Sequence, residues 1–289
     1  EVYDRIVLDV EDLRRTLDIE TVTVVPISAL FGDNVVEQGP RTSWYAGPTL
    51  LEVLESLPLE REDGPARFPV QLVIRPQLGA VDPAYVDYRG YAGHLASGTV
   101  RVGDEVVVAA SGVRTRVVGI DRGPESVQAA SAPLSVTLRL ADDVDVSRGD
   151  VIAAAETPPT LRRTADAVLC WLSEHSLAPG ARVLVSHGTR TVRALVTEIH
   201  DRLDIATLTL QPASGAELND LVSVSLAFAE PLPVEPYATS RDAGSLLVID
   251  AHDGWTLAAG MVDAVIPGAT ASGAAAATAP EPADEEPWL

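Results

Sequence analysis

Hydrophobic and polar positions follow one kind of spacing after Arg67 and another kind before Leu57. Residues 67–262 consist mainly of short apolar runs, rich in valine, that are separated by Gly, Pro, Asp and Ser. Short runs with turn residues between them, and without long helical periodicity, are typical of small β-barrels or sandwiches. The pattern therefore predicts a mainly β protein in which two barrels follow each other along the chain.

The first barrel is predicted within residues 63–158. Ser97-Gly98, Gly103-Asp104 and Ser111-Gly112 are expected turns, because glycine adopts a positive φ without steric cost. Gln77–Asp87 is expected to be a long loop. The expected strands are Phe68–Ile74, Tyr91–Leu95, Val106–Ala109, Val113–Ile120 and Leu134–Leu140.

The second barrel is predicted within residues 159–262, and a tail follows it. Residues 263–289 are rich in Ala, Pro, Gly, Thr and Glu, with five acidic and no basic side chains. Too few large apolar groups remain there to offset the entropy of ordering, so a disordered acidic tail is expected, with an acidic docking segment as the alternative. The expected strands of the barrel are Ala167–Leu172, Arg182–His187, Thr191–Glu198, Ala206–Gln211, Val222–Ala229, Val248–Asp250 and Thr256–Val262.

Residues 1–62 combine strand and helix spacing. Thr21–Ser28 carries valine or isoleucine on both faces, which predicts a parallel strand buried between helix layers. Gly47-Pro48 predicts a helix start with proline at the first helical position, and apolar residues follow at helical spacing until Pro58. A buried strand, a loop and an amphipathic helix are therefore expected in this order.

Several short motifs in this segment follow one another. Ser28-Ala29-Leu30 comes after the expected strand, and Gly32-Asp33-Asn34-Val35, Trp44-Tyr45 and Gly47-Pro48-Thr49-Leu50-Leu51-Glu52 come next. In these residues the chain resembles the translation-factor class of GTPases, and within that class the large subunit of bacterial sulfate adenylyltransferase. The resemblance runs from about Val2 to Val262. A plain tight turn at the end of a strand is the alternative interpretation of Ser28-Ala29.

The resemblance implies a fold and a site. Ser28, Ala29 and Leu30 would form the fifth guanine-nucleotide motif, whose backbone reaches the edge of the guanine base. Tyr3–Leu17 would be the helix before it, and residues 1–62 the carboxy-terminal remnant of an α/β P-loop GTPase domain. The two barrels would correspond to the second and third domains of elongation factor Tu and its relatives. The chain is then expected to be a carboxy-terminal fragment without the first four GTPase motifs.

The chain contains no lysine, since all 21 residues of the Lys+Arg count are arginine. A Gly-x-x-x-x-Gly-Lys-Ser/Thr phosphate loop and an Asn-Lys-x-Asp guanine motif are therefore absent from it. Phosphoryl transfer needs that loop, its lysine and a Mg²⁺ ion held by Ser/Thr and Asp. GTP and Mg²⁺ are thus implied for the complete subunit, whereas no cofactor and no catalytic residue are expected in this chain alone.

Charge and composition limit the class of partner. The formal net charge of −21 at pH 7 disfavours nucleic acids and anionic membranes, because both attract basic surfaces. Cys170 is the single cysteine, and we expect a small buried hydrophobe rather than a catalytic thiol. A lone cysteine, an acidic beginning and no apolar run of about 20 residues predict a cytoplasmic protein outside membranes.

Candidate metal sites do not meet the requirements of their chemistry. Asp143-x-Asp145-x-Ser147 begins like a calcium loop, but the later glycine and bidentate glutamate positions hold other residues. The histidines lack the paired spacing of a zinc site and are interpreted as surface or strand residues: His94, His175, His187, His200 and His252. No metal site is therefore expected.

The function implied by the resemblance is that of the regulatory GTPase subunit of sulfate adenylyltransferase. That complex joins ATP and sulfate to give adenylyl sulfate and pyrophosphate, GTP hydrolysis drives the step, and a separate small subunit performs the adenylyl transfer. The expected partners are this small catalytic subunit and an amino-terminal GTPase half, if it is separately encoded. Two alternatives stay open: a non-enzymatic tandem-barrel binding module and a translation-factor fragment that touches RNA.

Overall fold

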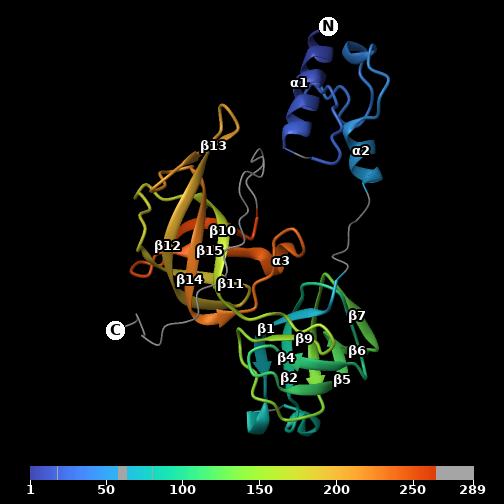
Figure 1. Cartoon of the computed structure of the whole chain (residues 1–289). Helices are drawn as coiled ribbons and strands as arrows, with labels where there is room; N and C mark the ends of the chain where they lie inside the picture. Colours follow the sequence, from blue (N-terminus) through green and yellow to red (C-terminus); the bar gives the residue numbers. More distant parts are fainter. Residues whose placement is uncertain (18, 58–63, 80, 265–289) are drawn as a thin grey trace. The chain divides into compact units, whose positions relative to one another are not determined.

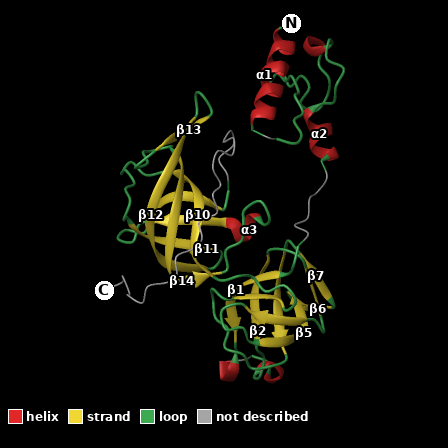
Figure 2. Cartoon of the chain, viewed as in Figure 1, coloured by secondary structure: helices red, strands yellow, loops and turns green. Residues whose placement is uncertain are grey.

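The computed structural model describes residues 1–17, 19–57, 64–79 and 81–264, which fall into two compact units. Residues 1–60 make the first unit and residues 61–289 the second. Helices and loops build the first unit, whereas the second consists mainly of strands (Figures 1 and 2). Among the described residues, no helix combines the length and the apolar character needed to cross a membrane.

The first unit contains α1 (Val2–Thr16), the 3₁₀ turn η1 (Pro40–Thr42) and α2 (Leu50–Ser56). Helix α1 lies where the resemblance placed one, at Tyr3–Leu17. Thr21–Ser28, in contrast, is not a strand, and only Ser28 makes an isolated bridge, to Asp33. The prediction of a buried strand is therefore wrong. Within the described residues no neighbouring strand pairs with this segment, so Val22 and Ile27 stay 39% and 48% exposed.

Helix α2 begins later than predicted, because Thr49 is its N-cap. The Glu52 N–H donates to Thr49 Oγ1 at 3.3 Å, and the Thr49 N–H donates to the Glu52 carboxylate at 2.8 Å. This reciprocal capping box fixes the helix start at Leu50 and leaves Pro48 outside the helix rather than at its first position. The Thr-x-x-Glu spacing in the sequence carried this signal.

The first barrel closes from six strands. Around the ring, β4, β9, β1, β2, β8 and β5 are hydrogen-bonded neighbours, and β4 pairs with β5 to close it, while β6 extends from β5 and β3 pairs with β7. Buried apolar side chains, among them Phe68, Tyr91 and Leu138, fill its interior. The bounds are β1 (Arg67–Ile74), β2 (Gly90–Leu95), β3 (Thr99–Arg101), β4 (Glu105–Val108), β5 (Arg114–Arg122), β6 (Glu125–Val127), β7 (Ala129–Ser131), β8 (Leu134–Leu140) and β9 (Val151–Ala154), and the loop after β1 contains the turns η2 (Gln77–Gly79) and η3 (Pro83–Tyr85).

The second barrel has the same construction. Its ring runs β11, β15, β16, β10, β14 and β12, the pairing of β11 with β12 closes it, and β13 extends from β12. A short helix, α3 (Arg241–Gly244), precedes β15. The bounds are β10 (Arg162–Trp171), β11 (Arg182–His187), β12 (Arg190–Asp204), β13 (Thr209–Pro212), β14 (Leu221–Leu232), β15 (Ser245–Ile249) and β16 (Thr256–Val262).

Alternation along the strands explains why these segments form barrels. In β14, Val222, Val224, Leu226 and Phe228 are buried, whereas the small residues between them face outward. A period of two places every second side chain on the inner face, and closing the sheet removes those side chains from water on all sides. The prediction of a mainly β fold with two tandem barrels is confirmed.

The structure adjusts several details of the predicted strands. Each expected strand of the two barrels overlaps an observed one, but residues 206–208 of the expected strand Ala206–Gln211 belong to a turn. The pattern missed β3, β6, β7 and β9, because runs of three or four residues are too short to show alternation. Gly98, Gly103 and Gly112 have the positive φ expected of turn glycines. Most of the predicted tail, residues 265–289, lies outside the described residues, and the predicted domain limits stay predictions.

Candidate functional site

The predicted guanine-side motif forms a tight turn in the first unit. The Gly32 N–H donates to the Ser28 carbonyl at 2.7 Å, and the Ser28 N–H donates to the Asp33 carbonyl at 3.1 Å. Leu30, at the tip, is 84% exposed. Among the described residues, neither the Ala29 nor the Leu30 amide has a hydrogen-bond partner, so both N–H groups are available to a ligand.

Asn34 supports this turn, and its side chain is completely buried. Its Nδ2 donates to the Pro26 carbonyl at 2.9 Å, and its Oδ1 accepts from Thr42 Oγ1 at 2.9 Å. Its backbone carbonyl accepts the Leu50 N–H, also at 2.9 Å, at the start of α2. One side chain and one carbonyl thus connect the segment before the turn, the 3₁₀ turn η1 and the helix.

Asp33 and Arg41 complete the support of the turn. The Arg41 guanidinium donates to the buried Asp33 carboxylate at 3.2 Å and lies over the Phe31 ring, 3.7 Å from its centroid. The Asp33 carboxylate packs so closely on Gly39 that a Cβ at that glycine would overlap it. Asp33 and Asn34 were part of the ordered motifs, whereas Arg41 and Thr42 were not, and the supporting role of all four became visible only in the structure.

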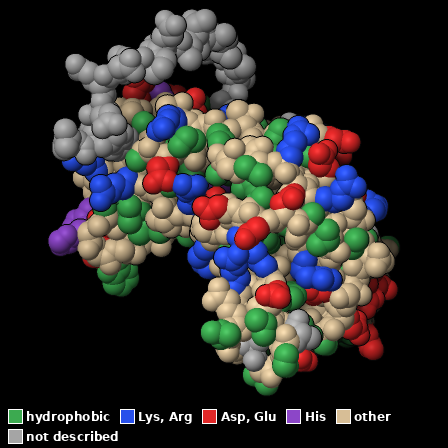
Figure 3. Space-filling view, turned by 90° about the horizontal axis from the view of Figure 1, so that it is seen from below, with side chains coloured by type: hydrophobic (Ala, Val, Ile, Leu, Met, Phe, Trp, Pro, Cys, Tyr) green, Lys and Arg blue, Asp and Glu red, His purple; other side chains and the backbone are tan. Residues whose placement is uncertain are grey.

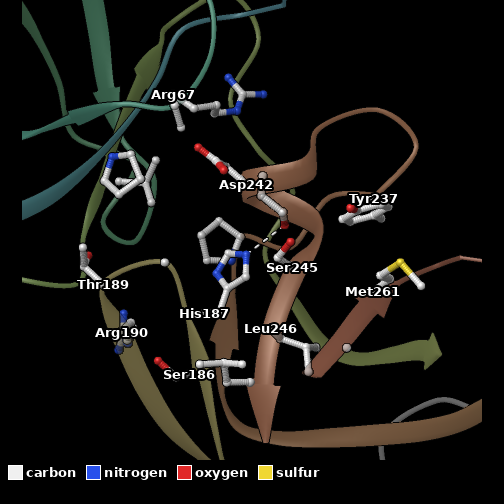
Figure 4. Close-up of a pocket in the computed structure, with 18 of the residues that line it drawn as sticks. Arg67, Ser186, His187, Thr189, Arg190, Tyr237, Asp242, Ser245, Leu246 and Met261 are labelled. Atoms are coloured by element: carbon white, nitrogen blue, oxygen red, sulfur yellow. Dashed lines mark hydrogen bonds between the residues drawn. The ribbon is translucent and has the colours of Figure 1, made fainter. Parts of the chain in front are cut away.

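A second candidate site is a cavity of about 660 Å³ within the second unit, lined by residues of both barrels (Figure 4). The first barrel contributes Arg67, Pro69 and His94, among others. In the space-filling view, basic side chains gather near the hollow between the two barrels (Figure 3). The second barrel contributes the β11–β12 turn, strands β15 and β16 and helix α3, with Ser186, His187, Thr189, Arg190, Asp242, Leu246 and Met261.

A buried ion pair joins the two barrels at the edge of this cavity. Arg67 Nη2 and Nε donate to one carboxylate oxygen of Glu235 at 2.7 and 3.0 Å, and both side chains are largely removed from water. A second contact involves the turn at Gly188, where a Cβ would meet Pro69 of the first barrel. The barrels therefore present the cavity as one structural unit.

His187 is a buried titratable group in the cavity wall. Its Nε2 lies 2.8 Å from the Ala243 carbonyl, which assigns the proton to this nitrogen. Burial lowers the pKa of the His187 imidazole below its ordinary value, against the smaller opposing effects of that hydrogen bond and of the Glu235 charge. The ring is therefore held in its neutral form at pH 7.

Other side chains considered from the sequence have structural contacts. Asp143 pairs with Arg75 and Arg89, and Asp150 accepts the Ser147 N–H at 2.8 Å, so these carboxylates serve the barrel turns. Cys170 is half-buried and lines the cavity of the second unit. Residues 1–17, 19–57, 64–79 and 81–264 contain no cluster of three or more His, Cys, Asp or Glu side chains that could hold a metal ion.

Comparisons with known proteins cover both units. Residues 164–263 match the family described as GTP-eEF1A C-terminal domain-like. The bifunctional enzyme CysN/CysC of Mycobacterium tuberculosis H37Rv is 42% identical over 266 residues, which are 91% of this chain and 43% of that protein. Sulfate adenylyltransferase subunit 1 of Methylorubrum populi is 40% identical over 287 residues, 99% of this chain and 59% of the relative. The same subunit of Aeromonas salmonicida is 38% identical over 91% of this chain and 54% of its own length.

Solved structures give the same fold. The crystal structure of sup35 complexed with GMPPNP has a TM-score of 0.62 and 23% sequence identity, and the match covers 90% of this chain and 64% of sup35. At this identity the likeness concerns the fold alone. The chain spans about half the length of the curated relatives that it matches.

Proposed function

We propose that this chain, which is homologous to sulfate adenylyltransferase subunit 1 along 91–99% of its length, is part of the GTPase subunit of that enzyme. The supporting observation is the near-complete coverage, which takes in the helical unit and both barrels. In this proposal the enzyme joins ATP and sulfate to give adenylyl sulfate and pyrophosphate, and GTP hydrolysis drives the reaction in the cytoplasm. The small catalytic subunit is the proposed partner.

The residues of this chain fit one side of a guanine nucleotide. The Ala29 and Leu30 amides have no partner among the described residues and stand at an exposed tip, as contacts to a base edge require. Nothing in the sequence fits the phosphate side, because a phosphate loop needs the lysine that this chain lacks. Bound GTP with Mg²⁺ would supply the phosphoryl group for hydrolysis. Its phosphates would be held by residues beyond this sequence.

Exposed apolar residues of the first unit support the proposal that other residues complete the nucleotide site. Helices α1 and α2 bury no residue, and Val2, Leu8, Val22, Ile27 and Leu54 remain at the surface. Burial of apolar surface contributes about 25 cal/mol per Å², so such a face is expected to gain stability from a covering layer. We propose that the remainder of a GTPase domain forms this layer.

The decisive experiment restores the missing nucleotide side. The chain is co-expressed with the small subunit and with the part of a homologous subunit 1 that carries the Asn-Lys-x-Asp motif. GTP-stimulated formation of adenylyl sulfate is then measured. We expect activity from the three components together and only background binding of GDP by this chain alone. Micromolar, guanine-specific binding by the chain alone would contradict the proposal.

A matched pair of variants tests the turn itself. Leu30→Pro removes the amide N–H, whereas Leu30→Ala retains it and shortens an exposed side chain. In the restored complex, Leu30→Pro should weaken GTP binding roughly tenfold, as expected for a lost hydrogen bond of about 1.4 kcal/mol, and Leu30→Ala should have little effect. Failure to restore activity, together with RNA binding at moderate salt, would favour a translation-factor role instead.

A further inference from the structure

The cavity of the second unit has the size of a ligand site, and the proposed GTPase function does not use it. Its volume of about 660 Å³ falls within the range of roughly 300–1,000 Å³ that is typical of small-molecule pockets. Such pockets occur preferentially where two domains meet. Both barrels line this one, so its position and its size agree with a binding role.

The cavity walls are mainly apolar. Pro69 and Val151 come from the first barrel, and Val168, Leu246 and Met261 from the second. These side chains come from separate elements that the barrel fold brings together. An apolar group placed between them would lose contact with water on several sides, which is the main favourable term in such binding.

The charged residues of the lining already have partners or remain in water. Arg67 is bound by Glu235, and Arg190 pairs with Glu230. Asp242 is exposed at the edge. An anionic ligand would therefore compete with existing carboxylates, and a cationic ligand would meet only a solvated carboxylate. Transfer of an unpaired charge into an apolar site is costly, so the lining selects against both kinds of ion.

Thr189 provides a polar anchor without a partner. Its Oγ1 is shielded from solvent and makes no hydrogen bond in the described part of the chain. Thr189 as a whole is half-buried and lines the cavity. Because its Oγ1 is shielded, the surface that Thr189 exposes comes from its other atoms. Rotation about χ1 to another staggered position can turn Oγ1 toward the cavity. A ligand group in reach would then satisfy a hydroxyl that is otherwise orphaned.

We propose that this cavity binds an uncharged, mostly apolar ligand that carries one hydrogen-bonding group, with Thr189 Oγ1 as the anchor for that group. The apolar body lies against Pro69, Val151 and other apolar residues of the lining. Nucleotides, sulfate and other anions should bind this site weakly, because they would compete with the carboxylates that pair with Arg67 and Arg190. The site is thus chemically different from the proposed guanine-side turn.

Cys170 makes binding measurable. It is the single cysteine of the chain and lines the cavity, so the rate of its alkylation reports on occupancy. The probes are naphthalene, 2-naphthol and 2-naphthoate, which share one ring system. Naphthalene has no polar group, 2-naphthol carries a neutral hydroxyl, and 2-naphthoate carries a negative charge. We expect 2-naphthol to slow alkylation at the lowest concentration, and 2-naphthoate to need at least roughly tenfold more.

The isosteric variant Thr189→Val separates the anchor from the walls. It should weaken the binding of 2-naphthol roughly fivefold to tenfold, and leave naphthalene binding unchanged or slightly tighter. Thr99→Val, at a half-buried position in the first barrel that does not line the cavity, is the control and should change neither. Calorimetric titration with the same probes provides a second measurement that does not depend on the thiol.

Several outcomes would overturn the proposal. Equal protection by 2-naphthoate or AMP would show that the charge argument is wrong. If Thr189→Val binds 2-naphthol and naphthalene with the same relative affinities as the parent protein, Thr189 is not the anchor. No protection by any probe, or protection only after residues 265–289 are deleted, would show that the cavity of the full chain does not take such ligands. None of these outcomes depends on GTP binding, so they are distinct from failure of the proposed GTPase function.

Discussion

The first unit and the two barrels are stabilised by different kinds of interaction. In the barrels, apolar side chains such as Leu169, Val224 and Phe68 form closed cores and are almost completely buried. In residues 1–17 and 19–57, the only buried residues are polar: Asp33, Asn34, Thr42 and Thr49. The barrels therefore rest on the hydrophobic effect, whereas the first unit combines a small hydrogen-bond network around Asn34 with ring contacts among Tyr3, Trp44 and Tyr45.

This difference decides what each region contributes. A closed barrel needs no further layer, because its apolar residues are already covered. The first unit keeps many of its apolar side chains at the surface, and a hydrogen-bond network orders the segment around the Ser28–Leu30 turn. Local order without an apolar core is compatible with a binding loop that is completed by other residues.

The largest expected effect comes from the barrel core. Leu169→Ala removes a fully buried side chain and should lower the free energy of unfolding of the second barrel by about 3 kcal/mol. The matched control Leu8→Ala changes a residue of α1 that is 66% exposed and should change stability by less than about 0.5 kcal/mol. Urea denaturation measures both. Equal effects would contradict the comparison.

A slightly smaller effect is expected at the contact between the barrels. Glu235→Gln removes the charge that compensates the buried Arg67 guanidinium and should cost about 2–3 kcal/mol. Arg193→Gln, at an exposed position of β12, is the control and should be nearly silent. Because this pair joins the two barrels, Glu235→Gln should also separate their thermal transitions in calorimetry. A variant as stable as the parent would show that the pair is not needed.

In the first unit, the largest local effect is expected from Asn34→Ala. The variant loses two hydrogen bonds of the carboxamide, to Pro26 and Thr42, and should cost about 1–2 kcal/mol locally. Hydrogen exchange should become faster at the Ser28 and Leu50 amides and stay unchanged in the barrels. Gln38→Ala removes one exposed hydrogen bond to Gly47 and serves as the control. Slower or unchanged exchange at the Ser28 amide would show that Asn34 does not position the turn.

The smallest expected effect is a dependence of barrel stability on pH through His187. Its pKa is lower in the folded protein than in the unfolded chain, because burial disfavours the charged ring. The unfolded state therefore binds more protons, so this contribution is complete above about pH 6.5 and is lost as the pH falls through the lowered folded pKa. His187→Asn should reduce the loss of stability between pH 7.5 and 5.5, which urea denaturation at each pH measures. An identical pH profile for His187→Asn would contradict this assignment.

Local patterns were sufficient for much of the fold. Alternation in Val222–Ala229 predicted a strand that the structure contains, and turn glycines such as Gly98 and Gly103 have the expected positive φ. Local patterns failed where a segment depends on distant partners. Thr21–Ser28 has the composition of a buried strand, but within the described residues no second strand pairs with it.

The candidate sites divide in the same way. Ser28, Ala29 and Leu30 could be selected from the order of motifs, but the support from Asn34 could not, because a buried asparagine with a positive φ has no periodic signal. The cavity was invisible in the sequence. Its lining residues come from elements as far apart as Arg67 and Met261.

The sequence by itself determined the mainly β class, the approximate strand positions and the absence of a lysine-dependent phosphate loop. These follow from periodicity and residue identity over short distances. Only the tertiary structure decided the closure of each barrel, the network around Asn34 and the joining of the barrels by Arg67 and Glu235, which are 168 residues apart in the chain. Such features depend on which distant segments meet, and this is set by the packing of whole sheets rather than by any local pattern.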